Sequence, residues 1–319
     1  MKFPFTYLKT FRINKKKNVL NKKANVLYLT RNALLEPLGQ SQVMAYLRGL
    51  SEYYSITVIS YEKFEDLSNN ELMDQARTNC SKYGIRWLPQ KFQPHQKIIP
   101  LALTILKMIW LVKKEVNRED IHLIHARSYI PAFVASIVKS LTGIPFIFDM
   151  RALWPEELIT ADRIKRGSWM HHAIVRLERS TLARSATVVS LTNVAVNYLK
   201  SKYLDELKNQ RIMVIPTCVD LERFIPNVKN YYNPKIYGCM GTILSGWFRT
   251  DLLSGWIRVA ALQDPKCRFE VLTRDDATKV RKILDPANEL VERLSIKSVL
   301  FKDIPDAIRV HGISLMFFY

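Results

Sequence analysis

The chain contains little cysteine, and its four cysteines lie far apart: Cys80, Cys218, Cys239 and Cys267. No C-x-x-C pair occurs, so the sequence predicts neither a zinc site nor a disulfide framework. A chain of this kind suits a reducing compartment. We therefore expect a cytoplasmic protein and no bound metal.

Long apolar runs are also lacking. The most apolar stretch, Ile98–Val112, is shorter than the roughly 20 residues that span a bilayer, and Lys107 interrupts it. Membrane insertion is the alternative, but a buried helix is the prediction for this stretch.

Acidic residues are scarce: 29 Asp and Glu stand against 48 Lys and Arg, a net charge of +19. Such a charge favours anionic partners, namely nucleic acid, sugar nucleotides or an acidic membrane face. Residues 1–23 hold basic residues and no acidic one, and no long apolar run follows, so they form neither a secretory signal nor an anchor. We expect a disordered basic tail, either solvated or touching anionic lipid. A nucleic-acid partner is disfavoured, because no recognisable module accompanies the charge.

The most informative stretch of the chain is 121–157, which predicts a βαβ unit. Ile121–His125 and Pro145–Phe148 are short apolar segments typical of buried parallel strands. Between them, Pro131–Leu141 has helical apolar spacing and ends at Thr142-Gly143. Ligands bind beyond the carboxyl ends of such strands. This sequence places polar or aromatic candidates there: His125, Arg127, Ser128, Asp149, Arg151, Trp154 and Glu156.

Alternating strands and helices continue on both sides of this unit, which predicts an α/β protein with parallel sheets. At 319 residues two domains are the default. The first, 24–226, has further strands at Asn25–Thr30, Ile56–Ser60, Ile85–Leu88, Ala186–Leu191 and Arg211–Ile215, and helices at Gln40–Leu50, Asp66–Lys82, Pro100–Val116, Ser168–Arg184 and Asn193–Tyr203. The aperiodic stretch Pro226–Pro234 marks the boundary. The second, 227–319, has strands at Ile236–Gly241, Arg268–Thr273, Val299–Phe301 and Ile313–Phe318, and helices at Asp251–Gln263, Asp275–Leu284, Pro286–Leu294 and Pro305–Val310.

The turn after the first strand lacks G-x-G-x-x-G, which disfavours a dinucleotide-binding dehydrogenase. It reads RNALLEPLGQSQ, with Gly39, Gln40 and Ser41 at the start of a helix. Backbone N–H groups at a helix start can receive an anion or a sugar hydroxyl. The alternative for Gly39 is ordinary turn chemistry.

Five phrases together carry a family resemblance: EPLGQSQV-x-x-YLRGL (36–50), HARSY (125–129), FIFDMRALWPEE (146–157), LERSTLARSATVVSLT (177–192) and VIPTCVDLERF (214–224). They resemble the acceptor domain of family 4 glycosyltransferases. The resemblance covers roughly Asn25 to Tyr319. It implies a GT-B-like fold, in which two Rossmann-like doubly wound domains face a cleft, and transfer of a sugar from a nucleotide diphosphate with retention of configuration.

The resemblance also implies roles for individual residues of the first domain. In many such enzymes a histidine after the fourth strand contacts the transferred sugar, and His125 matches it; with Asp149 it forms the expected catalytic pair. Acceptor-binding residues would be Gly39, Gln40, Ser41, Arg127, Ser128, Arg151, Trp154 and Glu156. For Glu156 the alternative is to favour the dipole of a helix first turn. His122, in contrast, is expected to be structural.

For the donor, the resemblance implies Thr217, Asp220, Gly241, Thr242, Arg249 and Arg274 as binding residues. Asp220 has an alternative as a cap of the Leu221–Phe224 turn, and single arginines are often only solvated. The donor would be a UDP- or GDP-linked sugar, used as substrate, with no cofactor.

One family feature is missing: the donor-side glutamate pair E-x7-E does not occur. We therefore expect the second domain to be incomplete and the chain to be truncated. Two hypotheses follow. The first is a glycosyltransferase of the cell-envelope polysaccharide type, acting on a glycan or lipid-linked acceptor at the inner face of the cell membrane. The second is a non-catalytic remnant or paralogue that binds acceptor, membrane or a partner.

Overall fold

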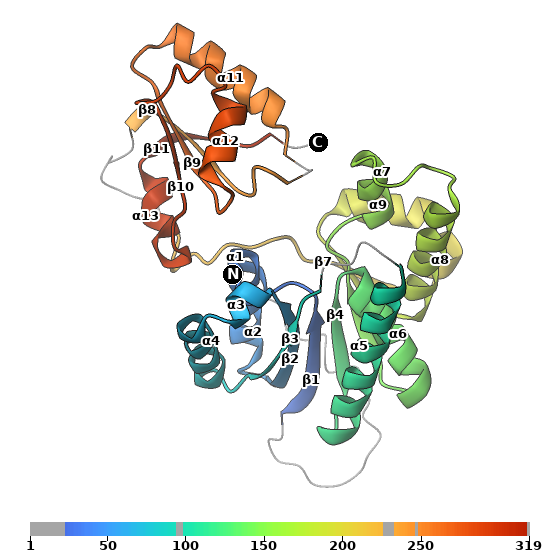
Figure 1. Ribbon diagram of the computed structural model, residues 1–319. Helices are drawn as coiled ribbons and strands as arrows, with labels where there is room; N and C mark the ends of the chain where they lie inside the picture. The colour runs from blue at the N-terminus through green and yellow to red at the C-terminus, as the bar shows by residue number, and fades with distance from the viewer. Residues whose placement is uncertain (1–22, 94–97, 226–232, 246–247, 318–319) are drawn as a thin grey trace.

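The structure is a computed structural model that describes residues 23–93, 98–225, 233–245 and 248–317. It forms two lobes, each built on a parallel sheet (Figure 1). The expected basic tail, apart from Lys23, and the expected boundary at 226–227 lie outside the described residues. The parallel α/β class predicted from the sequence is confirmed.

The first lobe contains a seven-stranded sheet in the order β3-β2-β1-β4-β5-β6-β7. Its strands are β1 (Ala24–Thr30), β2 (Tyr54–Glu62), β3 (Arg86–Lys91), β4 (Leu123–Arg127), β5 (Phe146–Asp149), β6 (Thr187–Ser190) and β7 (Arg211–Val214). Its helices are α1 (Pro37–Gly39), the π-helical turn η2 (Gln40–Met44), α2 (Ala45–Leu50), α3 (Phe64–Leu67), α4 (Asn70–Lys82), α5 (Ile98–Arg118), α6 (Tyr129–Thr142), α7 (Trp154–Thr160), α8 (Trp169–Arg184), α9 (Asn193–Lys202) and α10 (Leu204–Leu207).

Helices cover both faces of this sheet, which explains why its central strands carry buried apolar residues on both faces. On β1, Leu27 and Leu29 pack into the larger core with residues of α5 and α6. Tyr28 lies between them in the chain and belongs to the core on the opposite face, where it packs with Met44 of η2 and Leu47 of α2. Successive residues of a strand point to opposite faces, so one strand serves two cores.

The carboxyl ends of three neighbouring strands meet at the edge of this sheet. In the parallel register Thr30 of β1 lies beside Arg127 of β4, and Arg127 lies beside Asp149 of β5. The strand order reverses between β1 and β4, which is where doubly wound sheets bind ligands. These strand ends point toward the second lobe (Figure 1).

The second lobe contains a four-stranded sheet in the order β10-β9-β8-β11. Its elements are β8 (Asn233–Met240), α11 (Thr250–Gln263), β9 (Arg268–Leu272), α12 (Ala277–Leu284), β10 (Leu294–Lys297), the 3-10 turn η3 (Phe301–Asp303), α13 (Ile304–Arg309) and β11 (His311–Leu315). One core joins α11 and α12 to the sheet, with Phe269 and Val271 of β9 among its buried residues.

Two predicted elements of the second lobe are wrong. No helix forms at Pro286–Leu294, because the Asp285 carboxylate accepts the backbone N–H groups of Glu289 and Leu290 and holds a turn. No strand forms at Val299–Phe301. The strand of this region is β10, where Leu294 pairs with Phe269.

Smaller differences concern the helices of the first lobe. The helix predicted at Asp66–Lys82 is broken, because the side chain of Asn69 caps a new helix by accepting the N–H of Leu72. The α5 stretch is buried on one side only, so its prediction as a buried helix is half right: Met108 and Val112 are fully buried, whereas Trp110 is exposed. Among the helices that the structure describes, none has both the length and the apolar character of a membrane span.

Candidate functional site

Four predicted residues meet where β4 and β5 end: His125, Arg127, Asp149 and Arg151. Asp149 is at the centre. Its Oδ2 lies 3.3 Å from His125 Nε2 and 3.5 Å from Arg127 Nη1, and its Oδ1 lies 3.5 Å from Arg151 Nη1. We call these four residues the strand-end cluster.

The strand-end cluster is largely shielded from solvent. The side chains of Arg127 and Asp149 are 3% and 6% exposed, and that of His125 is 21% exposed. Burial by itself raises the pKa of Asp149, but the hydrogen bond from His125 and the charges of His125, Arg151 and Arg127 hold that pKa below its ordinary value. Asp149 is therefore ionised at neutral pH, and the cluster keeps a positive excess from its two guanidinium groups.

His125 is held from a second side by an aromatic contact. Tyr28 is its partner in the β1–β4 register, and the two ring centroids are 4.6 Å apart. Burial raises the pKa of Tyr28, so its hydroxyl remains neutral. The imidazole is thus fixed between a tyrosine ring and a carboxylate, while one-fifth of the side chain remains accessible.

Gln42 joins the two arginines of the cluster, a role that the sequence did not reveal. Its Oε1 accepts hydrogen bonds from Arg127 Nη2 at 2.8 Å and from Arg151 Nη2 at 3.2 Å. Gln42 belongs to the π-helical turn η2, and such turns are frequent at functional sites. This contact connects the loop after β1 to the ends of β4 and β5.

The predicted residues Gly39, Gln40 and Ser41 lie on the same loop but are engaged within it. A Cβ on Gly39 would overlap the carbonyl oxygen of Ala33 and lie 2.7 Å from the Cα of Leu34, so only glycine permits this close approach. Gln40 Nε2 donates to the carbonyl of Leu34, and Ser41 Oγ donates to that of Pro37. These contacts shape the loop, and a ligand-binding role for the three residues stays a prediction.

Glu62, at the end of β2, is a second positioning residue that the sequence did not reveal. It is fully buried, and its two carboxylate oxygens accept the N–H groups of Leu34 and Leu35 at 2.9 and 3.1 Å. Burial raises its pKa, although the hydrogen bonds from Ser60, Leu34 and Leu35 oppose the rise. An acidic residue ending an otherwise uncharged strand is the signal that could have identified it.

Ser128 occupies an unusual backbone position directly after β4. Its φ of 74° lies in the left-handed region that disfavours side chains, and its N–H donates to the carbonyl of Asp149 at 2.8 Å. The backbone link therefore ties the end of β4 to the end of β5. Strained residues of this kind cluster at functional sites.

Trp154 and Glu156 belong to α7, whose first turn also holds Pro155. Trp154 packs against Tyr129, with ring centroids 5.3 Å apart. Glu156 bonds to Arg166 and Tyr198, both at 2.6 Å, and to Lys202 at 3.3 Å. Burial is the largest single influence and opposes ionisation, but the hydrogen bonds to Tyr198, Arg166 and Lys202 together outweigh it and lower the pKa of Glu156 to about 2. The observed contacts of Glu156 thus join α7 to α9.

The sequence also did not reveal the role of Glu178, a buried residue of α8. Tyr129 donates its hydroxyl proton to Glu178 Oε1 at 2.6 Å, and Tyr203 donates to Oε2. The Tyr129 oxygen in turn accepts the N–H of Trp154 at 3.2 Å. A carboxylate on α8 therefore fixes the loop that follows Asp149.

Two predicted donor-binding residues, Thr217 and Asp220, lie in the segment between β7 and β8 and differ in their surroundings. Thr217 is exposed, and its Oγ1 lies 3.4 Å from Arg151 Nη2, at the border of the strand-end cluster. Asp220 Oδ1 accepts the N–H of Glu222 at 3.1 Å. Asp220 thus caps the turn at 221–224, as its alternative interpretation predicted.

The remaining donor-binding predictions fall in the second lobe. Gly241 has φ 152° with open space where a side chain would be, and Thr242 is exposed. Arg249 forms a two-pronged pair with Asp251, at 2.8 and 2.5 Å. Arg274 lies 3.7 Å from Asp66 of the first lobe. The two arginines are therefore not joined to the strand-end cluster, and Arg274 connects the lobes instead.

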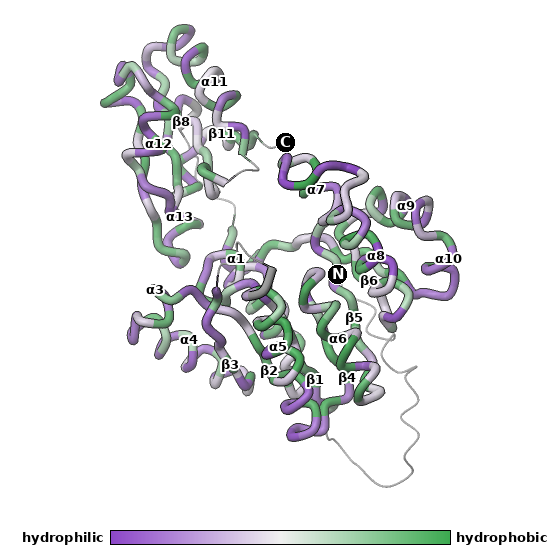
Figure 2. Tube along the Cα trace, turned by 45° about the vertical axis from the view of Figure 1, so that its right-hand side comes forward, coloured by the Kyte–Doolittle hydropathy of each residue, from purple (hydrophilic) through white to green (hydrophobic). Residues whose placement is uncertain are grey.

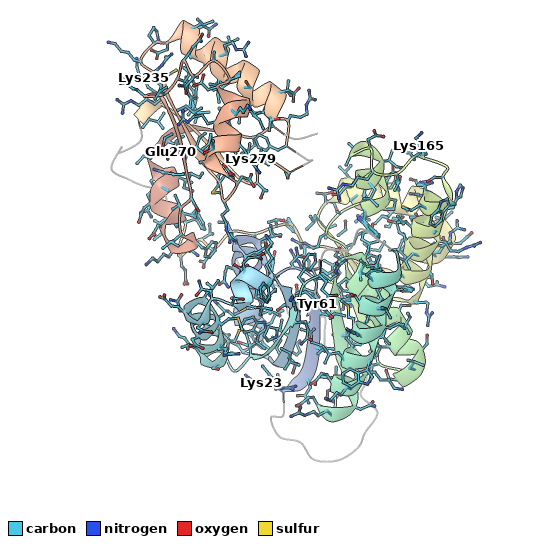
Figure 3. The ribbon with its side chains drawn as sticks, in the orientation of Figure 1. Lys23, Tyr61, Lys165, Lys235, Glu270 and Lys279 are labelled. Carbon is cyan, nitrogen blue, oxygen red and sulfur yellow. The ribbon has the colours of Figure 1, made fainter. Side chains whose placement is uncertain are left out.

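Two histidines outside the strand-end cluster, His122 and His311, have partners within the protein. His122 Nδ1 accepts the N–H of Asn25, as expected for a structural histidine. In the second lobe the buried His311 lies 2.7 Å from Glu270, which also pairs with Lys297; Figure 3 shows Glu270 within that lobe, apart from the first. In the part of the chain that the structure describes, no three His, Cys, Asp or Glu side chains gather as metal ligands would.

Two facing parallel-sheet lobes and a polar cluster at a strand-order reversal define the GT-B type of fold. Sucrose-phosphate synthase from Thermosynechococcus elongatus superposes with a TM-score of 0.65 at 12% identity, over 92% of this chain and 75% of that one. HepE from Anabaena, solved with UDP and glucose, gives 0.59 at 14%, over 91% and 73%. A glycosyltransferase from Rickettsia africae gives 0.56 at 16%, over 93% and 73%.

The sequence shows the family as well. The chain belongs to Glycosyltransferase Family 4, which it matches over residues 41–223, more than half of its length. The matched region contains the whole strand-end cluster. No curated protein matches the chain.

Proposed function

We propose that the protein transfers a sugar from a nucleoside diphosphate donor to a glycan or lipid-linked acceptor, with retention of configuration. The observation that carries the proposal is the convergence of His125, Asp149, Arg127 and Arg151 at the strand-order reversal of a family 4 chain. This cluster places an imidazole beside two guanidinium groups and a carboxylate in a place largely shielded from solvent.

In this proposal His125 contacts the transferred sugar. An imidazole can donate to a hydroxyl or accept a proton near neutral pH. The ionised Asp149 orients the ring by binding Nε2, which leaves Nδ1 for a second contact. Of the two catalytic candidates, His125 is more exposed than Asp149, and contact with a substrate requires an accessible side chain.

The arginines supply positive charge. Departure of a nucleoside diphosphate places negative charge on phosphate oxygens, and preorganised cations stabilise it. Both guanidinium groups lie beside Asp149, and the Arg151 side chain, 13% exposed against 3% for Arg127, is the more accessible of the two. Arg151 contacts Thr217, which belongs to the segment leading from β7 to the second lobe.

The donor is proposed to be a UDP- or GDP-linked sugar. Support comes from solved relatives of the same fold: HepE holds UDP and glucose, and an S. aureus protein named MnaA was solved with UDP. Gly241 and Thr242, in the open loop after β8, are the proposed phosphate-facing residues of the second lobe. The other proposed donor contacts are Thr217, Asp220, Arg249 and Arg274.

The acceptor is proposed to be of the cell-envelope polysaccharide type, met in the cytoplasm at the inner face of the membrane. The net charge of +19 supports attraction to anionic lipid and to sugar nucleotides alike.

The test is calorimetric titration of the full chain with UDP- and GDP-linked sugars, followed by transfer assays with radiolabelled donors and membrane lipid extracts. We expect binding of one donor class and labelling of an extractable acceptor. Absence of both rejects sugar transfer by this chain. Binding of the acceptor extract without any turnover favours the non-catalytic alternative.

A further inference from the structure

Helix α5 presents an apolar stripe to solvent. Leu103, Leu106 and Trp110 have exposed fractions of 55%, 60% and 63%, and they lie three and four residues apart, on one face of the helix. The opposite face, with Met108 and Val112, is buried in the core of the first lobe. Figure 2 shows hydrophobic residues along α5.

The charged residues on this exposed face share one sign. Lys107, Lys113 and Lys114 are all exposed, and Lys114 Nζ lies 5.1 Å from the ring centroid of Trp110. The acidic residue of the same helix, Glu115, points inward: it is buried and pairs with Arg86 at 2.6 Å. The face 103–114 therefore combines large apolar side chains with lysines and has no exposed carboxylate.

We propose that this face docks onto an anionic lipid bilayer, with α5 lying in the plane of the interface. Leucine and tryptophan side chains enter the boundary between headgroups and acyl chains, and lysines on the flanks contact acidic headgroups. Tryptophan is enriched at that depth because its ring is apolar with one polar atom. A lysine stem can also lie along the apolar surface while its charge stays in water.

Charge decides between a bilayer and another occupant. A second apolar stripe occurs on α11, where Leu252, Val259 and Leu262 are exposed. Its exposed charges are Asp251 and Arg258, which cancel. Electrostatic attraction to an anionic membrane therefore favours docking through α5 and does not favour docking through α11.

Docking through α5 does not depend on sugar transfer and can be measured without substrate. The full chain is mixed with vesicles of phosphatidylcholine and phosphatidylglycerol at a 70:30 ratio, or of phosphatidylcholine alone, and bound protein is measured by flotation. We expect binding to the anionic vesicles, weakened by added salt.

Two variants separate α5 from the basic residues at 1–23, which both retain. The triple change Lys107→Gln, Lys113→Gln and Lys114→Gln should lower the partition coefficient about 100-fold, because each lysine near an anionic surface contributes about fivefold. The triple change Leu103→Ser, Leu106→Ser and Trp110→Ser should lower it at least tenfold. Leu262→Ser on α11 is the matched control and should bind as the wild type does.

The proposal is overturned if both triple variants bind anionic vesicles like the wild type, since binding would then come from elsewhere in the chain. It is equally overturned if the wild type does not bind anionic vesicles. The same holds if it sediments as a dimer that the triple serine variant of Leu103, Leu106 and Trp110 converts to a monomer. That result would assign the face to a second copy. Circular dichroism of each variant checks that the fold is kept, as expected for substitutions of exposed residues.

Discussion

His125 and Asp149 stand on neighbouring parallel strands, with Nε2 3.3 Å from Oδ2, at the point where both strands end. The carboxylate is buried and the imidazole is partly accessible. This pairing holds the ring in one orientation and makes Asp149 the common partner of the histidine and two arginines.

Asp149→Asn should therefore cost both stability and activity. The substitution leaves the guanidinium of Arg127 buried without a carboxylate, and removing one partner of a buried pair costs about 3 kcal/mol or more. Urea unfolding monitored by circular dichroism measures the loss. Asp306→Asn, in a solvent-exposed pair with Arg309, is the control and should leave the midpoint unchanged. Equal midpoints for Asp149→Asn and wild type would contradict the account.

Gly39→Ala tests the close approach in the loop after β1. The added methyl group meets backbone atoms of Ala33 and Leu34, which cannot move aside as a flexible side chain can. We expect destabilisation of about 1 to 3 kcal/mol. Gly49→Ala, in helix α2 with open space around it, is the matched control and should stabilise by about 0.5 to 1 kcal/mol. The reverse order of the two melting temperatures would refute the geometry.

Glu62→Gln tests the carboxylate that anchors the same loop. A carboxylate accepts at both oxygens, whereas an amide must direct its NH₂ group at the N–H of Leu34 or Leu35. We expect a loss of about 1 to 3 kcal/mol for the unsatisfied buried group. Glu65→Gln, an exposed residue of α3, should have no effect. Thermal melts of the three proteins give the comparison, and no loss for Glu62→Gln would show that the anchor is dispensable.

Glu156 should make part of the stability sensitive to acid. Its pKa is about 2 in the folded protein and ordinarily near 4.5, so its ionised form is favoured by folding. That contribution is complete above the unfolded pKa and is lost as pH falls toward the folded one. The difference in unfolding free energy between wild type and Glu156→Gln should be constant above pH 5 and shrink between about pH 4.5 and 2. A difference that does not change with pH would contradict the assignment.

The sequence predicted the elements around the strand-end cluster well, because short apolar strands bounded by glycine, proline or polar residues are local signals. His125, Arg127, Asp149 and Arg151 were placed by the rule that ligands lie beyond strand ends, and the structure brings them together. Their binding and catalytic roles remain predictions.

What the sequence did not reveal depends on partners distant in the chain. Gln42 contacts Arg127 and Arg151, 85 and 109 residues away, and no local pattern reports such a contact. The wrong helix at 286–294 has a similar origin: helical propensity was plausible there, but the side chain of Asp285 captured two backbone N–H groups. Side-chain competition of this kind is invisible to apolar periodicity.

The central claim is that His125 serves sugar transfer from the strand-end cluster. The most direct measurement compares kcat for transfer from the bound nucleotide sugar in the wild type, His125→Asn and His122→Asn. The account predicts that His125→Asn lowers kcat by a factor of about 100 or more, while nucleotide binding by calorimetry is kept and His122→Asn turns over like the wild type. Equal kcat values for His125→Asn and wild type would contradict it.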